Sequence, residues 1–160
     1  MLPPIEDMHP KIRALLEHWR ALRTPQGLPG RHHLDAAAIP GLLPYIWMLD
    51  VVRDPLRYRF RLVGEAQRAA GSPIRPGMWM HELHEGGRLP ELIRASLELV
   101  VTKGEPDWYR GKPSMPHIEH IVGLERLSLP LASDGREVDV VLNATVFHWE
   151  PGFWEEPGRT

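Results

Sequence analysis

Two pairs of histidines spaced three residues apart are the first candidates for chemistry in this sequence. His81 and His84 fall in a stretch that the pattern predicts as a short helix, so both imidazoles would share one side and could bind a metal ion. His117 and His120 fall on a predicted strand, where residues three apart point to opposite faces, so that pair cannot chelate. Because only one pair is suitable and no third ligand is evident, we expect exposed helix histidines and no metal site.

Three arginines alternate along one predicted strand and could contact phosphate or nucleic acid. These are Arg57, Arg59 and Arg61. A hairpin turning at residues 53 to 55 would place Asp50 opposite Arg57 on the outer face. We therefore favour a structural interpretation, in which the arginine stems cover the sheet and one guanidinium is paired.

Catalytic motifs are scarce. The sequence has no glycine-rich phosphate loop, no nucleophile elbow and no His-Glu-x-x-His helix. Glu82, Glu85 and Glu98 fall on predicted helices, where solvation explains them. The absence of cysteine excludes disulfides, iron–sulfur clusters, thiolate zinc sites and covalent haem attachment. We expect no catalytic residues, and an acid–base enzyme is kept only as a less favoured alternative.

Composition indicates one domain whose charge is too balanced to attract nucleic acids or membranes. The chain has 160 residues, 42% of them hydrophobic, which is enough to bury a core. Its 19 basic and 21 acidic residues give a formal charge of −2, so we expect no nucleic-acid and no membrane partner. No basic, apolar leader opens the sequence and no apolar run approaches the roughly 20 residues of a membrane span, so we expect a cytoplasmic protein.

The elements that must position these residues follow from hydrophobic periodicity. An amphipathic helix is predicted over residues 8 to 23, followed by a loop to residue 44 with one helical turn near 36 to 39. Further predicted elements are strands over 45–52 and 56–63, short helices over 64–71 and 78–85, a long helix over 89–103, and strands over 107–110, 118–131 and 138–149. This order predicts an α+β fold, with one antiparallel sheet and helices on one face.

Four stretches carry a resemblance to a known family. They are residues 28 to 35, 39 to 51, 58 to 64 and 125 to 135, among them Pro40-Gly41-Leu42-Leu43-Pro44 and Leu127-Ser128-Leu129-Pro130-Leu131. Their combination resembles the single-domain bacterial PAS family (PAS_5 type). The resemblance implies a PAS-like five-stranded antiparallel sheet over residues 28–149, preceded by the helix and linker of residues 1–27 and followed by a flexible tail over 150–160. It also implies a small apolar cavity beneath the long helix, in a scaffold used for sensing and partner contact. Because some PAS domains bind haem through a histidine, the cofactor is left open.

A ligand cavity could form where the long helix crosses the sheet. We predict an inward sheet face of Tyr58, Phe60, Leu62, Leu127, Leu129, Val140, Leu142 and Val146. The candidate ligand-binding residues are Tyr58, Phe60, Trp79, His84, Leu92, Ser96, Trp108 and Leu142. The alternative, in which large side chains fill this space, stays open.

The outer face of the sheet also needs cover. Met48, Val141 and Phe147 are predicted to point outward, and the apolar stripe of the N-terminal helix could cover them in the same chain or from a partner. We therefore expect a homodimer, and a protein partner that carries the output. The resulting hypothesis is a non-enzymatic, cytoplasmic PAS-type regulatory domain that binds an unidentified small apolar or amphipathic molecule, a protein partner, or both. The alternative is a pure interaction module with a filled core.

Overall fold

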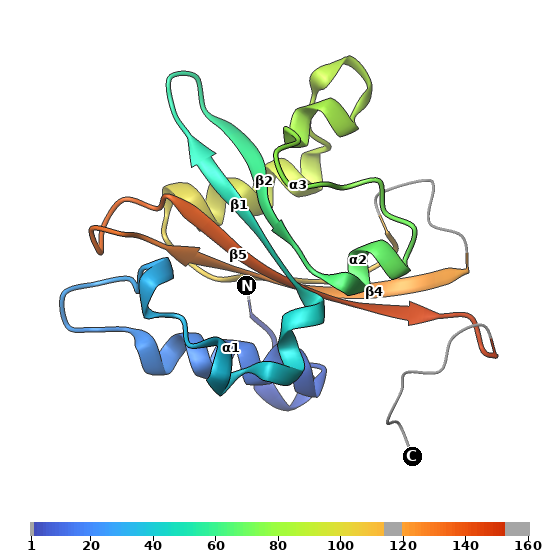
Figure 1. Cartoon of the computed structure of the whole chain (residues 1–160), viewed down its shortest axis with the longest axis horizontal. Helices are drawn as coiled ribbons and strands as arrows, with labels where there is room; N and C mark the ends of the chain where they lie inside the picture. Colours follow the sequence, from blue (N-terminus) through green and yellow to red (C-terminus); the bar gives the residue numbers. More distant parts are fainter. Residues whose placement is uncertain (1, 114–119, 153–160) are drawn as a thin grey trace.

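The sheet has five strands, all antiparallel to their neighbours, in the order β2-β1-β5-β4-β3 (Figure 1). A computed structural model describes residues 2–113 and 120–152. The strands are β1 (Ile46–Val52), β2 (Arg57–Val63), β3 (Asp107–Gly111), β4 (Ile121–Leu131) and β5 (Val140–Trp149). The predicted α+β class and the single antiparallel sheet are confirmed.

Helices lie on both sides of this sheet. Figure 1 shows α1 (Pro10–Leu22) on one side and α2 (Glu65–Ala69) and α3 (Glu91–Leu97) on the other. The helix α3 continues as a π-helical segment, η7 (Glu98–Thr102), so the predicted long helix is present with a change of winding. The remaining elements are 3-10 helices: η1 (Ile5–Asp7), η2 (Arg31–His33), η3 (Ala36–Ala38), η4 (Pro40–Tyr45), η5 (Met80–Leu83) and η6 (Glu85–Gly87).

The α1 helix covers one sheet face with its apolar stripe. Its start is set by Pro10, and the His9 side chain accepts a hydrogen bond from the backbone N–H of Lys11 at 3.2 Å. The buried stripe consists of Ile12, Leu15, Leu16 and Trp19. The indole N–H of Trp19 donates to the carbonyl of Pro130 at 3.0 Å, so its one polar group is satisfied. The cover of this face therefore comes from the same chain.

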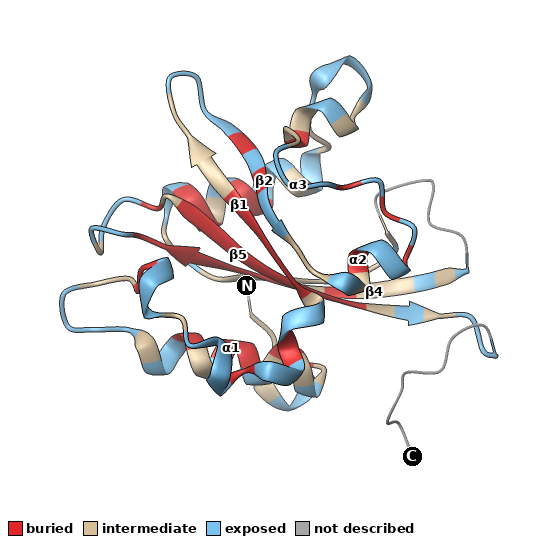
Figure 2. Cartoon of the chain, in the orientation of Figure 1, coloured by how far each residue is buried: buried red, intermediate tan, exposed pale blue. Residues whose placement is uncertain are grey.

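The predicted orientation of β4 and β5 is wrong. The side chains that we expected to face the cavity pack under α1 instead; they are Leu127, Leu129, Val140, Leu142 and Val146. Conversely, Val141 lies in the core of the opposite face and Phe147 lines the cavity there. The central strands are buried on both faces (Figure 2), so hydrophobic alternation fixes two sets of residues without saying which set faces which helix.

The β1–β2 hairpin has a different register from the predicted one. Its turn holds four residues, 53 to 56, so Leu49 lies opposite Phe60 and Asp50 opposite Arg59. This shift of two residues leaves the side chains next to the turn on their predicted faces, and Tyr58 and Phe60 are buried toward α3 as expected. A register irregularity between Met48 and Leu49 then puts Leu62 opposite Met48, on the other face, where it is 41% exposed, so the prediction that Leu62 faces inward is wrong.

Candidate functional site

A cavity of about 80 Å³, hereafter the main cavity, lies between the sheet and the elements α2, η5 and α3. Its wall is mostly apolar and comes from all five strands of the sheet and from the covering segments. The lining side chains are Trp47, Phe60, Gln67, Ile74, Met80, Leu83, His84, Ile93, Tyr109, Pro113, Leu124, Arg126, Thr145 and Phe147. The core on this side is therefore not completely filled.

A smaller cavity of about 40 Å³, hereafter the side cavity, adjoins the main one. The two share Trp47, Met80, Ile93 and Arg126. The side cavity adds the polar residues Ser96, Ser128 and Asn143. The side cavity is thus the more polar of the two, while the main cavity has a mostly apolar wall with Gln67 and His84 among its polar members.

The polar groups sit on neighbouring strands because of the sheet register. Arg126 of β4 lies opposite Thr145 of β5, and Ser128 lies opposite Asn143. The Ser128 hydroxyl donates to Asn143 Oδ1 at 2.6 Å, and both residues are buried. The indole N–H of Trp47 donates to Thr145 Oγ1 at 3.0 Å. These bonds satisfy groups that would otherwise be costly to bury, and they fix the side chains around Arg126.

Arg126 is the charged residue of this wall. Its Nη2 atom is buried and has no hydrogen-bond partner within the described part of the chain. The guanidinium stands 5.6 Å from the centre of the Tyr109 ring, a cation–π contact. Burial lowers the pKa of Arg126, while the negative charge of Asp107 acts in the opposite direction. An arginine remains charged under such a shift, so a cation with unused donor capacity faces the cavities.

His84 contributes an uncharged ring to the main cavity. Burial lowers the pKa of His84 below its usual value, which favours the neutral imidazole near pH 7. The prediction that His81 and His84 share a helix is wrong, since η5 ends at Leu83 and His84 has extended backbone angles. Among residues 2–113 and 120–152, no three His, Asp or Glu side chains are grouped as a metal site would require. His117 lies outside the described residues.

The structure brings three of the eight candidate ligand-binding residues to these cavities. Phe60 and His84 line the main cavity, and Ser96 lines the side cavity. Tyr58 is buried in the same core without lining either cavity.

The other four candidates lie elsewhere. Leu92 is 44% exposed, and Leu142 lies under α1 on the opposite face. Trp108 packs against the α1 core, and Trp79 is stacked with Arg57 and Arg59 at 4.4 and 5.6 Å.

The three arginines of β2 make ion pairs and a cation–π contact on the surface of the sheet. Asp50 pairs with Arg59 at 3.5 Å and with Arg61 at 3.1 Å, so the predicted partner, Arg57, is wrong. Arg57 lies over the Trp79 ring instead. These contacts are exposed and contribute little to stability.

Sequence reasoning missed the polar part of the site, Gln67, Arg126 and Thr145. One signal was available for Arg126 and Thr145, because both are polar residues inside otherwise apolar strands and share a face with Ser128 and Asn143. A strand covered on both faces leaves no solvent side for these groups, so they must be satisfied internally or face a cavity.

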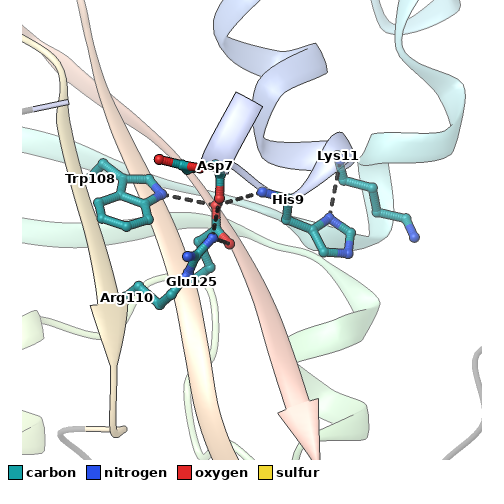
Figure 3. A network of polar contacts seen from close by, with 6 residues as sticks. All are labelled: Asp7, His9, Lys11, Trp108, Arg110 and Glu125. Carbon is teal, nitrogen blue, oxygen red and sulfur yellow. Dashed lines mark hydrogen bonds and ion pairs between the residues drawn. The ribbon is translucent and has the colours of Figure 1, made fainter. Parts of the chain in front are cut away.

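A second polar cluster, hereafter the Glu125 anchor, lies on the α1 side of β4 (Figure 3). Glu125 is buried, with 1% of its side chain exposed. Its carboxylate accepts hydrogen bonds from His9 N and Trp108 Nε1, both at 2.9 Å, and pairs with Arg110 at 3.0 Å. Arg110 also donates to the carbonyl of Asp7. The anchor therefore ties the start of α1 to the β3–β4 edge.

Burial alone would raise the pKa of Glu125. The hydrogen bonds from Trp108, His9 and Arg110, together with the Arg110 charge, outweigh that effect and lower the pKa. Glu125 is therefore an ionised, buried carboxylate whose role is to hold the N-terminal segment.

None of the helices in the described part of the chain has the length and apolar character needed to cross a membrane.

Comparison with known proteins agrees with the fold. No curated protein sequence matches the chain. The PAS_5 family model, described as a PAS domain, matches residues 7–145, and the match extends from the N-terminal segment through most of β5. With a five-stranded antiparallel sheet in the order β2-β1-β5-β4-β3 and helices over its cavity, this chain belongs to the PAS domain family, whose members are generally non-enzymatic sensory modules.

Proposed function

We propose that this protein is a non-enzymatic, cytoplasmic regulatory PAS domain that binds a small amphipathic molecule in the main cavity and acts through a protein partner. The observation that carries the proposal is an apolar cavity whose wall includes a partly buried Arg126 with a buried Nη2 atom that has no hydrogen-bond partner among the described residues. A filled core would provide neither feature. Concave, mostly apolar sites with a few placed polar groups are the usual form of small-molecule sites.

The size of the cavities limits the molecule. An engineered cavity of about 150 Å³ with purely apolar walls accepts benzene. The main cavity of about 80 Å³ and the adjoining side cavity of about 40 Å³ are smaller than that. They suit a molecule of a few carbon atoms and exclude a large aromatic cofactor unless the covering segments move.

The strand β4 connects the cavity with the start of α1 and could relay ligand binding to that helix. Glu125 and Arg126 are consecutive residues of this strand, and successive strand residues point to opposite faces. Arg126 lines the cavities and Glu125 holds the start of α1, so a ligand that shifts β3 against β4 would loosen or tighten the anchor. Hydrogen exchange at residues 9 to 13 tests this relay. Exchange that is unchanged on saturation with ligand would refute it.

Ligand binding in the cavity is testable with 4,4,4-trifluorobutanol, an uncharged probe detected by ¹⁹F NMR line broadening. Ser96→Trp should abolish binding, because Ser96 is buried in the side-cavity wall beside Arg126 and Trp47. Leu92→Trp on the same helix is the matched control, because Leu92 is 44% exposed, and it should bind normally.

Circular dichroism checks that both variants fold, and Ile93→Phe replaces Ser96→Trp if the latter does not. If the probe binds wild-type protein and the folded cavity variant equally, the site is elsewhere.

A second candidate, a protein-interaction module, is favoured by the β2 edge of the sheet. Leu43 and Leu62 are 44% and 41% exposed there, beside the charged residues Arg59 and Arg61. Since α1 covers its own sheet face, this edge is the proposed interface of the homodimer. Sedimentation of wild type and Leu62→Glu at high concentration tests the idea, and a wild-type monomer would exclude the homodimer.

A further inference from the structure

We propose that the ligand of the main cavity is a small carboxylate with a short apolar tail, with the carboxylate bound by Arg126 and the tail lying among Phe60, Ile74 and Leu83. The inference rests on the proposed function, because it names the chemical class of the molecule that the cavity would hold.

Charge is the first argument. The residues that line the two cavities include one arginine and no aspartate or glutamate. Asp107 is the acidic group whose charge reaches Arg126, but it lines neither cavity. A cation in an apolar enclosure is costly unless it is paired and hydrogen-bonded. A ligand carboxylate would supply the missing charge and the missing acceptor together.

Hydrogen-bond geometry is the second argument. Arg126 Nη2 has no acceptor among the described residues, and Thr145 stands directly opposite Arg126 in the β4–β5 pairing. Thr145 Oγ1 accepts from Trp47, and the hydrogen bonds of the described residues give its own hydroxyl hydrogen no acceptor. A guanidinium and a hydroxyl on adjacent strands, both in the wall of the main cavity, thus offer donors of the kind that a carboxylate accepts.

The distribution of polarity is the third argument. Arg126 lies where the two cavities meet, with Ser96, Ser128 and Asn143 on its side-cavity flank. Away from it, the main cavity is walled mainly by Phe60, Ile74, Leu83 and Phe147, with Gln67 and His84 as uncharged polar members of the same wall. One fixed positive charge matches a monoanion, whereas a phosphate dianion would leave a second charge uncompensated in this apolar enclosure.

The test compares 4,4,4-trifluorobutyrate with 4,4,4-trifluorobutanol, two probes of the same chain length that differ in charge. Binding to the 160-residue protein is followed by ¹⁹F NMR titration at constant ionic strength. Because a hydrogen bond to a charged group is worth about a factor of ten or more in an equilibrium constant, wild type should prefer the carboxylate by at least about tenfold. Arg126→Met should remove that preference, so that the affinities of the variant for the two probes lie within about twofold of each other. The control Arg88→Met removes an exposed arginine and should behave as wild type.

The outcomes separate the two proposals. Equal binding of both probes to wild type would overturn the carboxylate inference and leave the proposed cavity function standing. Binding of neither probe would overturn both. A carboxylate preference that survives in Arg126→Met would place the anion elsewhere and overturn the inference. Circular dichroism confirms folding, and Arg126→Gln, with the same expected loss, is used if Arg126→Met does not fold.

Discussion

Replacing Glu125 should destabilise the protein more than replacing any exposed carboxylate would. In Glu125→Ala, His9 N and Trp108 Nε1 each lose a carboxylate acceptor that lies at 2.9 Å, and both residues are partly buried. A donor left unsatisfied costs about 1–3 kcal/mol, and we take the lower half of that range for partly buried groups, giving about 2–4 kcal/mol for the pair. Arg110 is 46% exposed, so its ion pair adds little.

Thermal and urea denaturation measure this effect. For a domain of this size each kcal/mol moves the midpoint by about 2–4 °C, so a loss near 3 kcal/mol predicts a fall in Tm of roughly 6–12 °C. Glu125→Gln keeps one acceptor oxygen and should cost less, about 1–2 kcal/mol. Glu17→Gln on the exposed side of α1 is the matched control and should change Tm little.

The dependence on pH supplies a sharper check. The pKa of Glu125 is lowered in the folded state, so its ionised form adds stability that is fully present above about pH 4.3, the usual pKa of glutamic acid. That contribution disappears as the pH falls through the lowered folded-state pKa. The stability difference between wild type and Glu125→Gln should therefore be constant above about pH 5 and shrink below pH 4. A Tm for Glu125→Ala within 2 °C of wild type, or a difference that grows in acid, would refute this reasoning.

Three further predictions concern single residues. Arg126→Met should raise stability in the absence of ligand by about 1 kcal/mol, because it removes a partly buried charge with an unpaired Nη2 atom; a fall in Tm instead would mean that Arg126 holds the fold. His84 should titrate by NMR below pH 6.5, since burial lowers its pKa; stability from this residue is fully present above 6.5 and is lost as the pH falls from there through the lowered folded-state pKa, and His84→Gln should lose less stability than wild type over that range. Leu142→Ala should cost about 2–5 kcal/mol through a cavity under α1 while leaving trifluorobutanol binding unchanged; lost binding in a folded variant would restore Leu142 to the ligand site.

The order and type of the elements could be predicted because each carries its own local signal. The helix α1 is specified by the apolar stripe of Ile12, Leu15, Leu16 and Trp19. The strand β2 is specified by the alternation at Tyr58 and Phe60. Turn residues fixed the strand limits to within a few positions.

The facing of β4 and β5 could not be predicted in the same way. Leu142 and Val141 are neighbours, both are fully buried, and each packs under a different layer of helices. Only the three-dimensional packing of α1 and α3 decides which of them faces the cavity. For the same reason the role of Arg126 could not be predicted, because the cavity that it lines is formed by segments far apart in the sequence.

The central claim is that the space beneath α3 is a ligand site with Arg126 at its polar end. A crystal structure of the protein soaked with 4,4,4-trifluorobutyrate tests it most directly, because the trifluoromethyl group and the carboxylate give difference density at opposite ends of the probe. We predict trifluoromethyl density beside Phe60 and Ile74 and a carboxylate within hydrogen-bond distance of Arg126. Side chains that fill this space, or probe density found only outside it, would contradict the account.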